Sequence, residues 1–242
     1  MSAELWIVRA GLLPYEEARV AQKRLEAARQ AGEIPDVLLL LEHPPVYTRG
    51  RRSEPAELPM GVDWYERQGI EVRDTDRGGR VTYHGPGQLV GYPIMDLHPS
   101  GDDVHLYIRR MEQVVIGSLG EHGVEAGTIE GLTGVWTQPA DPPPGGAARK
   151  IASIGVHVSR GVTTHGFAIN VNNDLQPFEW IVPCGIDDCH VTSVARELRA
   201  EQDFDAFTDT VADRFAHVYD RIPADPDPGL LEGETGAALH IY

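Results

Sequence analysis

The chain has 242 residues, of which 41% are hydrophobic and 24% charged, and its formal net charge at pH 7 is −16. This length and composition predict a globular domain with a sizeable core, and they exclude wholesale disorder. No apolar run is long enough for a transmembrane helix, and so large a negative charge repels polyphosphate. We therefore expect neither a membrane nor a nucleic-acid partner.

The first six residues, Met-Ser-Ala-Glu-Leu-Trp, lack the basic and apolar regions of a signal peptide. The chain contains two cysteines, Cys184 and Cys189. Two cysteines in a chain of this length do not form a disulfide scaffold, and they predict a reducing, cytoplasmic location.

Strand-like and helix-like segments are mixed along the chain, and no internal repeat is present. Apolar runs predict strands at 5–8, 37–41, 70–73, 89–97, 135–137, 151–158 and 167–171, and a strand end running into a basic loop at 43–52. Helical spacing predicts helices at 15–30, 63–68 and 103–122, and one or two more within 194–219.

Local end signals support two of these helices. Gly32 stands where the first helix would end, and Asp102 or Asp103 stands where the long third helix would begin. The order of elements predicts a single α+β domain over residues 1–222, interrupted by a Pro/Gly-rich loop at 138–148. The acidic residues 223–242 are predicted to form a flexible tail.

A glycine-rich segment at 77–88, RGGRVTYHGPGQ, is the first candidate for a binding site. Glycines allow a backbone to approach a ligand closely, and amides in such loops bind carbonyl or phosphate oxygens. The alternative is a pair of tight turns between strands. His84 in this segment and His165 further on are candidate polar groups of a pocket, or else hydrogen-bonded core histidines.

Lysine is rare in this chain. Of 21 basic residues only Lys23 and Lys150 are lysines. Lys150 lies between the Pro/Gly-rich loop and an apolar strand, where partial desolvation would lower its pKa and suit it to proton transfer. The alternative is a strand-end lysine whose amine reaches water.

Cys184 lies between Pro183 and Gly185, which predicts a turn that exposes the thiol. Beside a cation, its thiolate would be a good acyl acceptor. The alternative is a small buried side chain. The spacing of Cys184, Cys189 and His190 does not match a zinc site, so no metal is predicted.

Four stretches together resemble one family: LLLLEHPPVYTRGRR (38–52), RGGRVTYHGPGQLVGYP (77–93), RKIASIGVHVSRGVTTHGFAINV (149–171) and PCGI (183–186). They are similar to the motifs of the lipoyl(octanoyl) transferases, which move octanoyl groups from acyl carrier protein to protein lysines. The resemblance implies a mixed sheet with flanking helices, as in lipoate–protein and biotin ligases.

The resemblance also implies roles for named residues. Cys184 and Lys150 would form a catalytic dyad. The substrate-binding residues implied by the resemblance are Arg77, Gly78, Gly79, Arg80, Val81, Thr82, Tyr83, His84, Ser153, Ile154, Gly155, Gly166, Phe167 and Ala168.

The implied reaction is a ping-pong transfer through an acyl-Cys184 thioester, with Lys150 as general base. It needs no bound cofactor, because the octanoyl group arrives on the phosphopantetheine of acyl carrier protein. The implied acceptors are lipoyl domains of 2-oxoacid dehydrogenase complexes and the glycine cleavage H protein. An acidic carrier needs a basic docking face, for which we expect Arg49, Arg51, Arg52, Arg109, Arg110 and Arg149.

Three alternatives remain at this point. An ATP-dependent lipoate–protein ligase would share the fold and need no nucleophilic cysteine. A related transferase would use another carrier and a cysteine elsewhere. A catalytically inactive module would bind a carrier or lipoyl domain without turnover.

Overall fold

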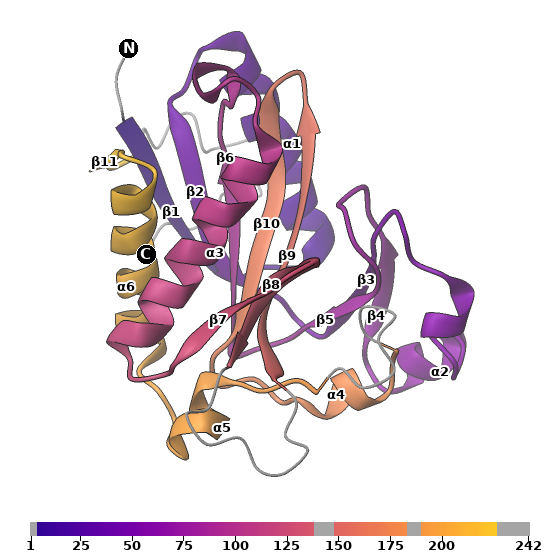
Figure 1. Cartoon of the computed structure of the whole chain (residues 1–242). Helices are drawn as coiled ribbons and strands as arrows, with labels where there is room; N and C mark the ends of the chain where they lie inside the picture. Colours follow the sequence, from indigo (N-terminus) through magenta and orange to yellow (C-terminus); the bar gives the residue numbers. More distant parts are fainter. Residues whose placement is uncertain (1–3, 138–147, 183–189, 227–242) are drawn as a thin grey trace.

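The structure is a computed structural model, and it describes residues 4–137, 148–182 and 190–226. An eight-stranded mixed sheet forms its centre, in the order β11-β1-β2-β6-β10-β9-β8-β7 (Figure 1). These strands are β1 (Glu4–Leu12), β2 (Asp36–Glu42), β6 (Gln88–Ile94), β7 (Ala126–Ile129), β8 (Leu132–Thr137), β9 (Arg149–Ser159), β10 (Val162–Asn170) and β11 (Ile222–Ala224). Strand β1 pairs in parallel with β2 and β11, and the other pairs are antiparallel.

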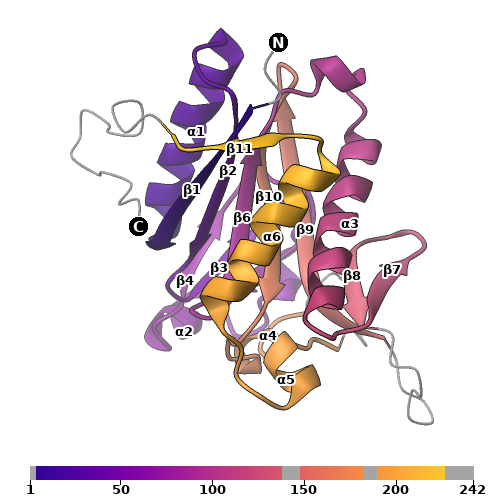
Figure 2. The same ribbon diagram turned by 90° about the vertical axis from the view of Figure 1, so that its left-hand side faces the viewer.

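Helices cover both faces of this sheet. Figure 2 shows α1 on one face, and α3 and α6 on the other. The six helices are α1 (Tyr15–Ala31), α2 (Val62–Arg67), α3 (Val104–Glu121), α4 (Gln176–Glu179), α5 (Val194–Leu198) and α6 (Phe204–Val218), as far as the described residues show. None of these helices has the length and apolar character needed to cross a bilayer.

A smaller sheet lies beside the large one, with the order β4-β3-β5 (Figure 1). Its strands are β3 (Val46–Arg49), β4 (Glu71–Asp74) and β5 (Thr82–His84). An aromatic core that includes Tyr47, Tyr65, Tyr83 and Phe178 packs this sheet against α2 and α4. The Tyr47 hydroxyl donates to the carbonyl of Pro177 (2.7 Å). This core therefore fixes the chain that leads toward residue 182.

The predicted helices and their end signals are confirmed. Gly32 follows α1 in a left-handed conformation with φ of 73°, as a C-cap glycine does. The Asp103 side chain accepts a hydrogen bond from the Leu106 amide (2.9 Å) and caps α3. The region 194–219 contains two helices, α5 and α6.

Four short strands were not predicted, and the fourth, β11, includes two residues of the predicted tail. Strand β3 lies within 43–52, where the sequence indicated a strand end and a loop, and β5 lies within the glycine-rich segment. Strand β7 is a four-residue strand whose sequence has no alternating pattern. Each is too short for a periodic signal and is formed by pairing with a distant or adjoining strand.

Two predicted segments lie largely outside the described residues. Of the Pro/Gly-rich loop only Ala148 is described, and of the tail only its first residues. Pro223 and Ala224 in that tail pair with β1 as part of β11.

Candidate active site

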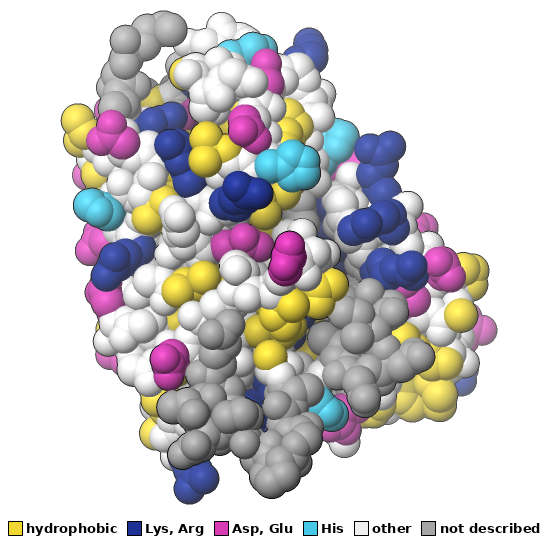
Figure 3. All heavy atoms as spheres, viewed as in Figure 1, with side chains coloured by type: hydrophobic (Ala, Val, Ile, Leu, Met, Phe, Trp, Pro, Cys, Tyr) yellow, Lys and Arg dark blue, Asp and Glu magenta, His cyan; other side chains and the backbone are white. Residues whose placement is uncertain are grey.

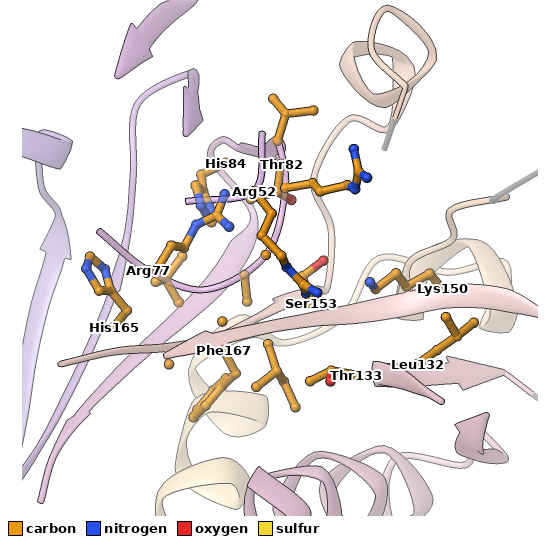
Figure 4. Close-up of a pocket in the computed structure, with 18 of the residues that line it drawn as sticks. Arg52, Arg77, Thr82, His84, Leu132, Thr133, Lys150, Ser153, His165 and Phe167 are labelled. Atoms are coloured by element: carbon orange, nitrogen blue, oxygen red, sulfur yellow. The ribbon is translucent and has the colours of Figure 1, made fainter. Parts of the chain in front are cut away.

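A cavity of about 340 Å³ opens where the two sheets meet. It is lined by Lys150 and by twelve of the fourteen predicted substrate-binding residues, all but Gly78 and Tyr83. In Figure 4, Lys150 and Leu132 lie toward one end of this cavity, and His165 and Arg77 toward the other. Residues that are far apart in the chain are thus brought around one space.

Small side chains form the floor of the cavity. Ser153 on β9 is directly opposite Ala168 on β10, and Gly155 is opposite Gly166. Positions two apart on a strand share a face, and so do directly opposite residues on neighbouring antiparallel strands. The four residues therefore share one face of the two strands and carry small side chains or none.

The glycine-rich segment forms the opposite wall. Its Gly78 amide donates to the carbonyl of Val156 on β9 (2.9 Å). On its other side, the amides of Arg51 and Arg52 donate to the carbonyls of Arg77 and Gly79, both at 3.0 Å. The loop is therefore fixed to β9 on one side and to the turn after β3 on the other.

This close approach depends on glycine at two positions outside the loop. A Cβ at Gly155 would lie 2.8 Å from the Gly78 carbonyl oxygen, and one at Gly50 would lie 2.5 Å from the Gly79 carbonyl oxygen. Both distances are shorter than a Cβ tolerates, so a side chain at either position would displace the loop.

Arg77 is buried and holds the loop from within. Its guanidinium donates to the Thr48 carbonyl (2.7 Å) and to the Thr48 hydroxyl (2.8 Å). These hydrogen bonds pair the buried guanidinium and connect the loop to β3. Arg77 also presents part of its surface to the cavity.

Lys150 lies on β9 at the other end of the cavity and is 8% exposed. Its Nζ is 5.1 Å from the centroid of the Trp136 ring on the neighbouring strand β8. Gly134 on β8 leaves space for the lysine stem, because a Cβ there would lie 3.0 Å from Lys150 Cε. A largely buried amine beside an aromatic ring suits the proton transfer expected of Lys150.

The backbone of Lys150 also holds the chain that follows Cys184. The Lys150 amide donates to the His190 carbonyl (2.7 Å), and the Thr192 amide donates to the Lys150 carbonyl (2.9 Å). Before Cys184, the Val182 amide donates to the Glu57 carbonyl (3.1 Å). Cys184 and Cys189 themselves lie outside the described residues. That they form no zinc site with His190 therefore stays a prediction.

Two buried histidines stand on the cavity wall away from Lys150. Burial, aided by the nearby His43 and Arg77, lowers the pKa of His84 well below its usual value. Burial also lowers the pKa of His165, although the Asp76 carboxylate at 2.7 Å opposes this effect. Both rings are therefore neutral near pH 7, and the Nε2–H of His165 donates to Asp76.

His165 has a positive φ of 57°, which a non-glycine residue seldom adopts. Its amide donates to the Gln22 side chain on α1 (2.7 Å), and this bond holds the unusual backbone conformation. His165 is thereby fixed from both its ring and its backbone.

Several lining residues were not identified from sequence. They are Tyr15, Val90, Tyr92, Gly131, Leu132, Thr133 and Trp136. Tyr15 begins α1, Gly131 lies in the turn of the β7–β8 hairpin, and Leu132 and Thr133 begin β8. Only strand pairing and helix packing bring these positions to the cavity, so no local signal in the sequence marks them.

The predicted basic face is divided in the structure. Arg51 and Arg52 are exposed beside the cavity, and Arg52 lines it. Arg49 pairs with Asp74 and Arg149 with Glu197. Arg110 lines a different hollow, between α3 and residues 219–221 that follow α6. Figure 3 shows a column of Lys and Arg side chains over the smaller sheet, on the side of the turn that follows β3.

Residues 14–216 match the family described as the lipoyl protein ligase A/B catalytic domain. An octanoyltransferase of Salinispora tropica is 53% identical over 195 residues, which cover 81% of this chain and 86% of the relative. The chain belongs to the octanoyltransferase family. The enzyme is therefore an acyltransferase, and the family predicted from the sequence motifs is confirmed.

A second relative, the octanoyltransferase of Solibacter usitatus, is 48% identical over 88% of the chain and 90% of its own length. Among solved structures, a bipartite lipoate–protein ligase from Thermoplasma acidophilum has a TM-score of 0.68 at 16% identity, covering 99% of this chain and 90% of that one. At this identity the likeness concerns the fold alone. It confirms the predicted mixed sheet with flanking helices.

Proposed function

We propose that the enzyme transfers an octanoyl group from the thioester of acyl carrier protein to a lysine amine of lipoyl domains. The observation that carries this proposal is the cavity itself, in which a strip of small residues extends from Lys150 toward two neutral histidines. Such a cavity suits an uncharged acyl chain with its reacting carbonyl at the Lys150 end. Family membership supports octanoyl as the acyl group.

In the first half-reaction, Lys150 takes the proton of the Cys184 thiol. The thiolate attacks the thioester carbonyl, and the tetrahedral intermediate expels the pantetheine sulfur, which takes the proton from Lys150 and leaves as a thiol. One carbon–sulfur bond forms and one breaks, and the acyl group remains on Cys184. Amides of the glycine-rich loop are our candidates for stabilising the oxyanion.

In the second half-reaction, the amine of the acceptor lysine attacks the acyl-Cys184 carbonyl. Lys150 accepts the amine proton, and the Cys184 sulfur leaves. Because a thioester is higher in free energy than an amide, the sequence of steps needs neither ATP nor a bound cofactor. Arginine at position 150 would pair with a thiolate but would not accept a proton, because its pKa is far above physiological pH.

The cavity also offers binding free energy to the acyl chain. Each buried methylene contributes about 0.8 kcal/mol, so an octanoyl chain buried in this cavity would bind well, and its binding free energy would depend on chain length. The remaining predicted binding residues, Gly78 and Tyr83, would act by supporting the loop and the smaller sheet behind it.

The proposed donor and acceptors are proteins. The proposed acceptors are lipoyl domains of 2-oxoacid dehydrogenase complexes and the glycine cleavage H protein, and the proposed location is the cytoplasm. A solved relative of this fold was studied together with its E2 lipoyl domain. Arg51 and Arg52, exposed at the cavity, are our candidates for contact with an acidic carrier.

The proposal is tested by presenting an apo-lipoyl domain with two acyl sources in parallel. One reaction contains octanoyl-carrier protein without ATP, and the other contains free octanoate with ATP. We expect lysine octanoylation only in the first. Modification only in the second would establish a ligase, and tight binding without modification in either would establish a binding module.

A further inference from the structure

A row of buried polar side chains connects the inner wall of the cavity with the end of β9 that carries Lys150. It begins at Arg77, whose guanidinium donates to the Thr48 hydroxyl (2.8 Å). The Thr48 hydroxyl lies 3.3 Å from His84 Nε2, and His84 Nδ1 lies 2.7 Å from the Gln88 side-chain oxygen. Most buried polar side chains in proteins are hydrogen-bonded, because an unpaired buried polar group costs free energy.

The row continues across the sheet through Asn170. The Gln88 amide donates to Asn170 Oδ1 (2.8 Å), and Asn170 Nδ2 donates to the Thr192 carbonyl (2.9 Å). The Thr192 amide in turn donates to the Lys150 carbonyl (2.9 Å). Gln88, Asn170 and Thr192 are 2%, 4% and 0% exposed, so water does not replace these bonds.

The direction of every bond in the row is determined. Gln88 Nε2 donates to the Tyr83 carbonyl and to Asn170, so its oxygen faces His84 and accepts from Nδ1–H. His84 Nε2 is then unprotonated and accepts from the Thr48 hydroxyl. Burial, which lowers the pKa of His84, keeps the ring in this neutral state.

Asn170 is the member on which the Lys150 end depends. It lies directly opposite Gln88 in the pairing of β10 with β6, and its Oδ1 also accepts from Asn173 Nδ2 (3.2 Å). With its oxygen engaged twice, its Nδ2 is directed to the Thr192 carbonyl. That contact supports the segment from His190 to Thr192, which pairs with the Lys150 backbone on both sides.

We propose that Asn170 is a positioning residue for Lys150, acting through Thr192, and that the Gln88–Asn170 pair links the loop wall of the cavity to the dyad end. This inference rests on the proposed function, in which Lys150 moves the protons. It assigns no contact with substrate to Asn170. A displacement of about 1 Å at a reacting group can lower a rate roughly 100-fold, so loss of this support should appear in the chemical step.

The test compares Asn170→Asp with Asn172→Asp. Asn172 is a matched control, because its Nδ2 also donates to a backbone carbonyl, that of Gln202 (2.9 Å), which has no bond to the Lys150 segment in the described structure. Single-turnover octanoyl transfer from carrier protein is measured for both. We expect Asn170→Asp to lower the rate at least about tenfold with little change in donor KM, and Asn172→Asp to change it by less than about threefold.

The pH profile separates positioning from general damage. At higher pH the introduced carboxylate has no proton to donate to the Thr192 carbonyl, and on protonation it regains one. The rate of Asn170→Asp relative to wild type should therefore rise as pH falls from 8 to 6. If Asn170→Asp does not fold, judged by circular dichroism, Asn170→Ser is measured against Asn172→Ser, with the same rate comparison deciding.

Two outcomes separate this inference from the proposed function. If Lys150→Arg is inactive but Asn170→Asp and Asn172→Asp have equal rates, or the rate ratio does not change with pH, Asn170 has no positioning role. If Lys150→Arg retains the wild-type rate, the proposed function fails, and with it the role of Lys150 that Asn170 would support.

Discussion

The two ends of the cavity differ in how their polar groups are held. At the inner end, His84 and His165 are neutral, buried and bonded through both the smaller sheet and α1. At the other end, the amine of Lys150 lies against the Trp136 ring, and its strand holds the chain that flanks Cys184. The two histidines at the inner end stay neutral, whereas Lys150 lies at the other end and is expected, with Cys184, to exchange protons during the reaction.

The largest effect should come from removing a proton acceptor at the Lys150 end. Lys150→Arg keeps a positive charge but cannot act as a base, so kcat for lipoyl-domain octanoylation should fall by about 100-fold or more. Lys23→Arg is the matched control, because Lys23 is the other lysine and pairs at the surface with Glu26 and Asp76. Equal activity of the two variants would show that Lys150 does not act as a base, and that the two ends of the cavity do not differ in this respect.

The second prediction concerns the cavity wall that the glycine-rich loop forms against β9. In Gly155→Ala, the new methyl would lie 2.8 Å from the Gly78 carbonyl oxygen and displace the loop. We expect unfolding free energy to fall by roughly 1–3 kcal/mol, measured by denaturant titration. Gly120→Ala, in helix α3 with no atom within 4 Å of its Cβ position, should instead be neutral or slightly stabilising. A loss as large at Gly120 would show that loop contact is not the cause.

The third prediction uses the pH dependence of stability to test whether a histidine buried behind the cavity is neutral. Burial lowers the pKa of His43, which bonds Tyr92 behind the cavity, to about 4. A histidine whose folded pKa lies below its unfolded value of about 6.5 binds fewer protons when folded, so stability is lost as pH falls below about 6.5.

For His43 alone, this loss approaches roughly 1.4 kcal/mol per pH unit between pH 6 and pH 4.5. Denaturant titrations of wild type and His43→Gln across this range give the two slopes. The variant should have the shallower slope. Identical slopes would mean that His43 takes up a proton in the folded state.

The smallest effect is expected at the surface. Arg51→Glu with Arg52→Glu should raise the KM for octanoyl-carrier protein several-fold at low salt, about 1 kcal/mol, and the effect should vanish at high salt. Arg109→Glu with Arg110→Glu, on α3, is the comparison. If the α3 pair has the larger effect, the carrier docks elsewhere than at the turn after β3.

Much of the cavity lining was predictable because its residues lie in contiguous motifs. The glycine-rich loop, the Ser153–Gly155 strand and the Gly166–Ala168 strand each have a strong local signature, and pairing of β9 with β10 aligns them. The contacts between motifs were not predictable. Trp136 reaches Lys150 only because a register shift between β8 and β9 pairs them.

The charged face shows the same limit. Arg49 and Arg149 looked equivalent to Arg51 and Arg52 in the sequence, but Asp74 and Glu197 pair with the first two. Asp74 is 25 residues from Arg49, and Glu197 is 48 residues from Arg149. Local charge patterns therefore overstate a basic face whenever acidic partners arrive through tertiary structure.

The central claim is the acyl-Cys184 intermediate, and intact mass spectrometry tests it directly. Wild type and Cys184→Ala are each mixed with octanoyl-carrier protein, without ATP or acceptor. We predict one added octanoyl group on wild type, removed by hydroxylamine and discharged by a lipoyl domain, and no addition to Cys184→Ala. An adduct that persists in Cys184→Ala, or transfer to the lipoyl domain at the wild-type rate in that variant, would contradict the account.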